Sequence, residues 1–181
     1  MNLDDRILII TKIAQENPKI GKTALMKYLY FLQEIEKVPL KYTFEIYTYG
    51  PYSSTVMDEI DYASQKGFLN ISFEQYGYGY SISCSSDGEA ALEDANIIRE
   101  YDSAISRIIT TFSGKTAKEL ELLSTLVYIA QLYQINRWEL TEENVCSSVK
   151  EVKPHFELDY IKQRYQFLSS GNYLDKALQL Q

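Results

Sequence analysis

Residues 22–69 read KTALMKYLYFLQEIEKVPLKYTFEIYTYGPYSSTVMDEIDYASQKGFL, and this stretch decides the fold. Over 22–36, apolar residues recur at steps of three or four, which predicts a helix that Pro39 ends. Over 41–48, apolar and polar residues alternate, which predicts a half-buried strand. Over 53–66, apolar residues again follow the helical period. The stretch is therefore predicted to be helix, strand, helix.

Glycine and proline mark the ends of these elements. Gly50-Pro51 is expected to break the strand, because proline has no backbone N–H for a neighbouring strand. Gly67 suits the position after the second helix, since glycine accepts the left-handed conformation that closes a helix.

The segments on either side complete a winged helix-turn-helix. An apolar stripe over 3–15 predicts a first helix, and 68–73 and 80–84 predict the two strands of a β-hairpin wing. The expected fold class is mainly α, of the α+β kind, with a winged helix-turn-helix domain over 1–88.

The C-terminal half is predicted to be a helical extension over 89–181. Its first part, 89–112, predicts one long helix of about 36 Å at 1.5 Å per residue. Thr116 and Glu119 have the spacing of a capping box that opens the next helix. A helix of this length needs a packing partner, either the C-terminal helices, in which case the chain packs as a single domain, or a second copy. A homodimer is therefore one expectation.

The composition excludes several classes of protein. The chain has 181 residues, 45% of them hydrophobic, but no apolar run of about 18 residues, so we expect no membrane span. The acidic start MNLDDR does not suit a signal peptide. Two cysteines without CxxC spacing predict free thiols rather than a disulfide scaffold. We expect a cytoplasmic protein.

Acidic residues concentrate in the middle third of the chain. The net charge is −7, and residues 51–112 hold three Lys/Arg against ten Asp/Glu. The wing and the helix over 53–66 lie in this part, and binding to DNA phosphates requires Lys or Arg. The acidic charge disfavours DNA binding, so a winged-helix DNA-binding transcriptional regulator is the alternative rather than the main interpretation. It depends on a basic face made by four lysines that otherwise form a solvated surface, Lys12, Lys19, Lys22 and Lys27.

Tyrosines are the second unusual feature, with sixteen in the chain. Tyrosine is enriched at protein interfaces because it combines a large rigid ring with a polar tip. The acidic residues of the helix over 53–66 would add charge complementarity to a basic partner protein. The predicted partner-binding residues are Tyr47, Tyr49, Tyr52, Asp58, Glu59, Asp61, Tyr76 and Tyr78.

Two segments carry a resemblance to a known family: LMKYLYFLQ at 25–33 and FEIYTYGPYSSTVMDEI at 44–60. Together they resemble the Panacea domain, also called the SocA-like family, and more closely the YwgA-like bacterial proteins of unknown role. The resemblance covers roughly residues 5–70. It implies a bacterial or phage protein that acts as an antitoxin by binding a partner protein directly, without a set of catalytic residues.

The sequence offers little that predicts catalysis. His155 is far along the chain from Cys84 and Cys146, and a surface histidine with two buried thiols is the ordinary interpretation. No residues have the spacing of metal ligands, and 21–23 (GKT) lacks the earlier glycine of a phosphate-binding loop. Trp138 is expected to anchor the core between two helices. We therefore predict a non-enzymatic protein-binding module with no catalytic residues, metal or cofactor, and antitoxin-like neutralisation of a partner as its specific form.

Overall fold

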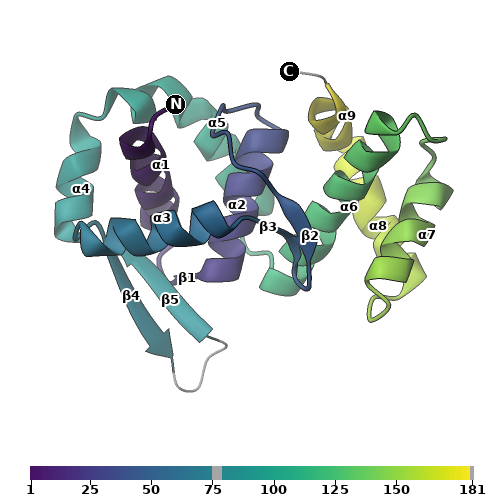
Figure 1. The fold of residues 1–181 in the computed structure, drawn as a ribbon, viewed down its shortest axis with the longest axis horizontal. Coiled ribbons are helices and arrows are strands. Elements are labelled where there is room, and N and C mark those ends of the chain that lie inside the picture. Colours follow the sequence, from purple (N-terminus) through teal and green to yellow (C-terminus); the bar gives the residue numbers. More distant parts are fainter. Residues whose placement is uncertain (75–78, 180–181) are drawn as a thin grey trace.

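The computed structural model describes residues 1–74 and 79–179 of the chain, which form a mainly helical α+β fold (Figure 1). The predicted Tyr76 and Tyr78 lie outside the described residues. The elements, in chain order, are α1 (Leu3–Glu16), β1 (Ile20–Gly21), α2 (Lys22–Glu34), β2 (Glu45–Tyr47), β3 (Gly50–Tyr52), α3 (Ser54–Gln65), β4 (Leu69–Glu74), β5 (Gly79–Cys84), α4 (Ser86–Glu93), α5 (Asn96–Phe112), α6 (Ala117–Ile135), α7 (Glu142–Val152), α8 (Leu158–Ser170) and α9 (Tyr173–Leu178).

The N-terminal part has the predicted winged-helix arrangement. Strands β4 and β5 form the antiparallel wing, and β1 pairs with the free edge of β5, which gives the strand order β1-β5-β4. Ile82 of β5 faces Ile20 of β1 on one side and Ile71 of β4 on the other. Gly67 follows α3 with φ +80°, the left-handed conformation predicted for it. The wing is thus anchored to the helices at both of its ends.

Helix α2 lies at the centre of the molecule. Residues 25–33 of this helix are all buried, because α1, α5 and α6 pack around it. The ring of Phe31 stacks on that of Phe112, the last residue of α5, with centroids 4.0 Å apart. The Tyr28 hydroxyl donates a hydrogen bond to the Phe112 carbonyl at 3.0 Å. The core is therefore shared by both halves of the chain.

The C-terminal helices pack against α6, which is itself closed at its start by the predicted capping box. The Thr116 hydroxyl accepts from the Glu119 N–H at 3.2 Å, and the Glu119 carboxylate accepts from the Thr116 N–H at 3.1 Å. Buried hydrophobic residues from both halves form one cluster, and position 88 falls inside α4. Nothing in this arrangement tests a division at 88 and 89, which stays a prediction.

The long helix predicted over 89–112 is wrong: the segment is divided between α4 and α5. Ala95 has φ −72° and ψ 107°, outside the helical region. Asp94 and Asn96, which flank it, both favour helix ends over helix interiors. The buried face of α5 packs against α1 and α2. The length of a single helix therefore no longer argues for a second subunit, and a homodimer stays a prediction.

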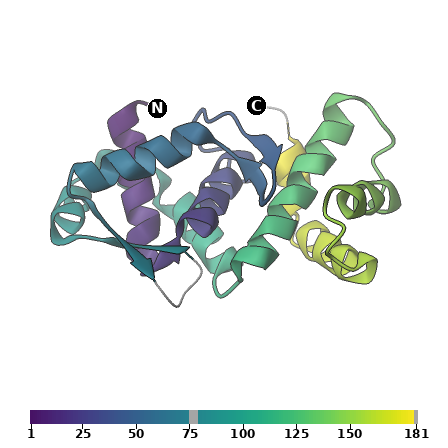
Figure 2. The same ribbon diagram turned by 60° about the horizontal axis from the view of Figure 1, so that its bottom comes forward.

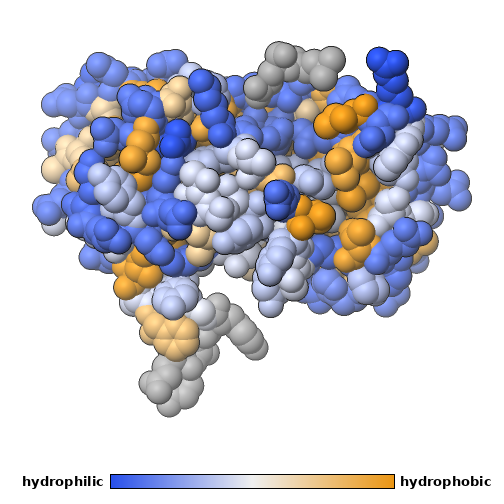
Figure 3. Space-filling view, viewed as in Figure 1, coloured by the Kyte–Doolittle hydropathy of each residue, from blue (hydrophilic) through white to orange (hydrophobic). Residues whose placement is uncertain are grey.

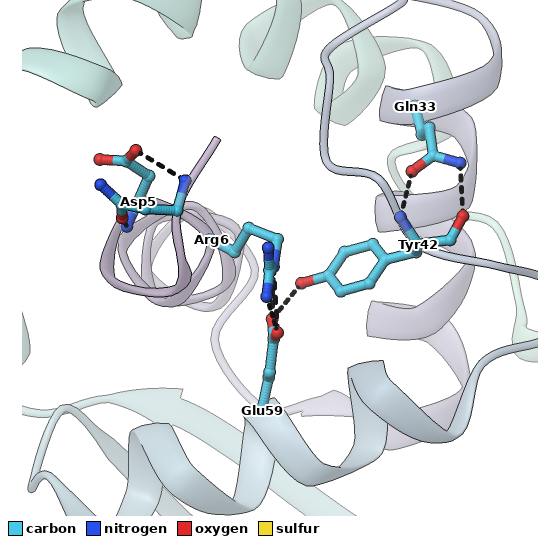
Figure 4. Close-up of polar contacts among 6 residues, drawn as sticks. Asp5, Arg6, Gln33, Tyr42 and Glu59 are labelled. Carbon is cyan, nitrogen blue, oxygen red and sulfur yellow. Dashed lines mark hydrogen bonds and ion pairs between the residues drawn. The ribbon is translucent and has the colours of Figure 1, made fainter.

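The strand predicted over 41–48 is also wrong in extent. Lys41 has φ +63°, and the side-chain amide of Gln33 takes both hydrogen bonds of the Tyr42 backbone, at 2.9 and 3.0 Å (Figure 4). Only Glu45–Tyr47 is a strand. Gly50-Pro51 does not break it but belongs to β3, which pairs with β2 through Ile46 opposite Pro51.

Trp138 does not anchor the core. Its side chain is 57% exposed, and its ring meets the ring of Tyr133 edge to face, at 5.3 Å between centroids. The loop between α6 and α7 that carries it is exposed from 135 to 141. A surface loop cannot bring its side chain into the core that α6 already fills.

Candidate partner-binding surface

The β2–β3 hairpin lies between the two halves of the molecule, along α6 (Figures 1 and 2). Two buried lysines donate hydrogen bonds to the backbone carbonyls of this hairpin. The Lys27 ammonium donates to the Pro51 carbonyl at 2.5 Å. The Lys153 ammonium donates to the Tyr47 carbonyl at 3.2 Å and to that of Thr48. The hairpin is therefore fixed at its tip and at its second strand.

A third buried charge, Glu121 on α6, balances these lysines. Its Oε1 atom lies 3.0 Å from Lys153 Nζ and 3.6 Å from His155 Nε2. The pKa of the Lys27 ammonium is lowered to about 7, chiefly by burial; the attraction of Glu121 opposes this shift, and the positive charge of Lys153 adds to it. Three charged groups in the interior thus support one small hairpin.

The hairpin presents three tyrosines to solvent. Tyr47 is 67% exposed, Tyr49 62% and Tyr52 38%. The rings of Tyr47 and Tyr52 lie side by side on paired strands, with centroids 5.7 Å apart. On the face in Figure 3, residues of intermediate hydropathy cover β3, and hydrophobic side chains lie next to them over β2 and α6. These are three of the predicted partner-binding residues, and their backbone is rigidly held.

The wing adds two more exposed aromatic residues. Phe73 and Tyr80 are both exposed, and their rings meet edge to face at 5.6 Å. The Lys22 ammonium lies 4.9 Å from the centre of the Tyr80 ring, and the same lysine lines a cavity with the hairpin tyrosines. We name the five aromatic residues together the aromatic surface: Tyr47, Tyr49, Tyr52, Phe73 and Tyr80.

Three cavities open around the hairpin. The inner cavity, of about 180 Å³, is lined by Lys22, Thr23, Met26, Lys27, Tyr47, Tyr49, Gly50, Tyr52 and Met57. The middle cavity, of about 480 Å³, is lined by Thr23, Tyr49, Ala117, Lys118, Glu121 and His155. The outer cavity, of about 590 Å³, is lined by Ile46, Tyr47, Thr48, Tyr49, Glu121, Val152, Lys153 and His155. Exposed rings beside hollows of this size are typical of surfaces that bind a partner.

Glu59, predicted to lie on the contact surface, is buried instead. Its residue is 5% exposed, and its carboxylate faces Arg6 of α1 and Tyr42 (Figure 4). Arg6 Nε donates to both carboxylate oxygens at 3.0 and 3.1 Å, and the Tyr42 hydroxyl donates at 2.5 Å. Burial and the hydrogen bond to Glu59 raise the pKa of Tyr42 well above its usual range. Glu59 therefore joins α3 to α1 and is not available to a partner.

The other two acidic residues of α3, Asp58 and Asp61, are exposed, but only one of them makes no ion pair with a described residue. Asp61 forms an ion pair with Lys22 at 2.6 Å, and Asp58 makes no ion pair with any described residue. Of the three acidic residues predicted for the contact surface, Asp58 and Asp61 are thus exposed, and their role in binding stays a prediction.

Of the four lysines of the basic face that DNA binding would need, Lys19 is exposed as predicted, and the other three are paired or buried. Lys12 pairs with Glu16 at 2.6 Å, Lys22 pairs with Asp61, and Lys27 is 2% exposed. The solvated surface that was the simpler interpretation is therefore wrong for Lys27. Burial of a lysine inside α2 places its charge where a phosphate group cannot reach it.

The two thiols and the single histidine of the chain have the following surroundings. Burial raises the pKa of the Cys146 thiol to about 11 and also raises that of Cys84, which makes both thiols poor nucleophiles. The His155 ring packs on that of Phe156 at 4.3 Å between centroids. In 1–74 and 79–179, no three His, Cys, Asp or Glu side chains lie close enough to hold a metal ion. None of the helices described there combines the length and apolar character needed to cross a bilayer.

Sequence reasoning missed the buried supports of the hairpin. Lys27 stands in a helical stretch of otherwise apolar and aromatic residues, and a charge in such a stretch indicates a buried ion or hydrogen-bond partner, whereas Glu121 has polar and charged neighbours that hide this signal. Lys153, just before a proline, gave no comparable signal. No protein-family model matches this sequence, and no curated protein matches it either.

Proposed function

We propose that this chain is a non-enzymatic module that binds a partner protein through the aromatic surface. The observation that carries the proposal is the β2–β3 hairpin. Its tyrosines are exposed, and its backbone carbonyls accept hydrogen bonds from Lys27 and Lys153. Large aromatic side chains on a rigid backbone lose little conformational entropy on binding, and they dominate the energetics of many interfaces. Aromatic contact rather than charge carries the binding, because Glu59 is buried and Asp61 is paired with Lys22.

The specific form of this function is antitoxin-like neutralisation of a partner protein in a bacterium or phage. The support is the resemblance of residues 25–33 and 44–60 to the Panacea family, and these segments contribute Lys27 and the hairpin to the surface described above. A basic partner is compatible with the exposed Asp58, whose contribution would be secondary. The paired lysines give less support to the alternative, a DNA-binding regulator.

The test is affinity capture in the organism of origin, with the whole chain as bait. Three baits are compared: the unchanged chain, a double variant Tyr47→Ser/Tyr49→Ser, and Trp138→Ser, which removes an exposed aromatic residue far from the hairpin. We expect one protein to be enriched by the unchanged chain and by Trp138→Ser, and to fall at least tenfold with the double variant. Equal recovery on all three baits, or recovery of chaperones alone, would contradict the proposal.

Antitoxin activity is tested with the captured partner itself. The partner is expressed from an inducible promoter with and without this chain. We expect growth arrest that the unchanged chain relieves and the double variant does not. A partner whose expression leaves growth unaffected would remove the antitoxin form of the proposal and leave protein binding in place.

A further inference from the structure

The three cavities beside the hairpin form one groove. Tyr49 lines all three, Thr23 belongs to the inner and middle cavities, and Glu121 and His155 belong to the middle and outer ones. We name this continuous depression the hairpin groove. It passes from α2 around the hairpin tip to the start of α6 and the end of α7. Three adjoining cavities suit a segment of chain rather than a single small group.

The inner cavity is the apolar end of the groove. Met26 and Met57 line it, and the tyrosines of the hairpin surround them. Its volume is about 180 Å³, and an apolar cavity of about 150 Å³ is known to admit a benzene ring. One aromatic or branched aliphatic side chain therefore fits. Methionine side chains adapt to the shape of such a group at low energetic cost.

The middle and outer cavities contain a buried acceptor without a donor. The Glu121 side chain is 7% exposed, and its Oε1 atom accepts no hydrogen bond from the described residues. Lys153 Nζ lies 3.0 Å away and forms an ion pair with it, but two of its three N–H groups go to the carbonyls of Tyr47 and Thr48, and its contact with Oε1 lacks hydrogen-bond geometry. Lys153 thus balances the charge of Glu121 without satisfying its oxygen. The missing group is an N–H donor, and it needs no positive charge.

We propose that the hairpin groove binds an extended peptide segment of a partner protein, with an aromatic or branched aliphatic side chain in the inner cavity and an N–H donor on the Glu121 carboxylate. This inference rests on the proposed function and names the kind of segment that the partner offers. The apolar anchor occupies the inner cavity and the donor reaches Glu121 in the middle and outer cavities, so a peptide that spans both positions is selected over one that fills only one of them.

The experiment uses a library of random twelve-residue peptides displayed on phage and selected on the whole chain. The most enriched peptide is synthesised with a fluorescent label, and its dissociation constant is measured by anisotropy on three variants. Thr23→Trp fills the mouth shared by the inner and middle cavities from an exposed position of α2. Thr55→Trp is the matched control, since Thr55 is exposed, occupies the same position in the first turn of α3, and lines none of the three cavities. Glu121→Gln keeps the shape of the acceptor and halves its number of acceptor oxygens.

We expect enriched peptides that combine an aromatic or branched residue with an amide, indole or guanidinium donor. Thr23→Trp should weaken binding at least tenfold, Glu121→Gln several-fold, and Thr55→Trp less than twofold. Peptides that bind Thr23→Trp as tightly as the unchanged chain would overturn the inference, as would a selection that enriches nothing. If either happens while the bait with Tyr47→Ser/Tyr49→Ser still loses its partner, the proposed function stands and only the groove is excluded.

Discussion

Lys27 carries an ammonium group into the interior of the protein, where it donates to the Pro51 carbonyl. Burial lowers the pKa of this group to about 7. The same side chain fixes the hairpin and borders the inner cavity. Lys27 thus supports the hairpin through a hydrogen bond, although burying a charged group costs free energy.

The first prediction concerns the pH dependence of stability. An unfolded chain binds the Lys27 proton up to about pH 10.4, whereas the folded protein releases it near pH 7. Between these values the unfolded state binds more protons, so the stability contributed by Lys27 rises with pH, and below about pH 6 it is constant. We compare the free energy of unfolding of the unchanged chain with that of Lys27→Met. The difference between them is expected to shift by about 2 kcal/mol in favour of the unchanged chain between about pH 7 and about pH 9.

Urea denaturation of both proteins at several pH values measures this difference. Other groups that titrate in the same range are common to both proteins and cancel in the comparison. A difference that does not change with pH would show that Lys27 is protonated throughout the range, and would contradict the lowered pKa.

The second prediction concerns Glu59. Replacement by alanine leaves the Arg6 guanidinium and the Tyr42 hydroxyl without their acceptor in a mostly buried place. We expect a loss of about 3 kcal/mol in the free energy of unfolding. Asp58→Ala on the exposed side of the same helix is the control and should change stability by less than about 0.5 kcal/mol. Equal effects of the two substitutions in urea denaturation would mean that the Arg6–Glu59 pair contributes nothing.

At the scale of elements, most helices follow from their own sequence. The periods over 3–15 and 53–66 and the capping box of Thr116 describe local geometry, which neighbouring residues determine. The hairpin of β2 and β3 does not follow in this way. Its six strand residues contain a glycine and a proline, and only the support of α2, α6 and Lys153 makes them a stable pair.

The third prediction tests how closely this hairpin is fitted to α6. Gly50 has φ +83°, and a Cβ at this position would lie 3.1 Å from both Ser124 Oγ and Thr125 Oγ1. Gly114 has φ +71° with nothing within 4 Å of its Cβ position. Gly50→Ala and Gly114→Ala share the backbone penalty of about 1–2 kcal/mol, but only Gly50→Ala adds a clash.

We therefore expect Gly50→Ala to destabilise the protein by about 1 kcal/mol more than Gly114→Ala, measured by thermal or urea denaturation. It should also weaken capture of the partner, because the tyrosines move with the hairpin backbone. If the two alanine variants have the same stability, the hairpin is not closely packed on α6.

At the scale of the whole molecule, the distribution of charge separates the two interpretations of a winged helix. The lysines of the first two helices are paired or buried, and the strongest exposed feature is aromatic. Chain regions that are distant in sequence build this feature together, since its supports come from α2, α6 and the end of α7.

The fourth prediction follows from this charge distribution. We expect no retarded complex when micromolar protein is mixed with genomic DNA fragments at about 50 mM salt, because Lys12 and Lys22 are ion-paired and Lys27 is buried. A retarded band that disappears steeply as the salt concentration rises would instead support the regulator.

The sequence by itself determined the order of helices, the wing and their caps, because these depend on residues within one turn or one hairpin of each other. It also indicated the tyrosines of the hairpin as candidates for binding. Only the tertiary structure decided that Glu59 is buried against Arg6, that Lys27 donates to the Pro51 carbonyl, and that Glu121 and Lys153 lie beneath the hairpin. Burial and ion pairing depend on which distant segments meet, and no local pattern of residues records that.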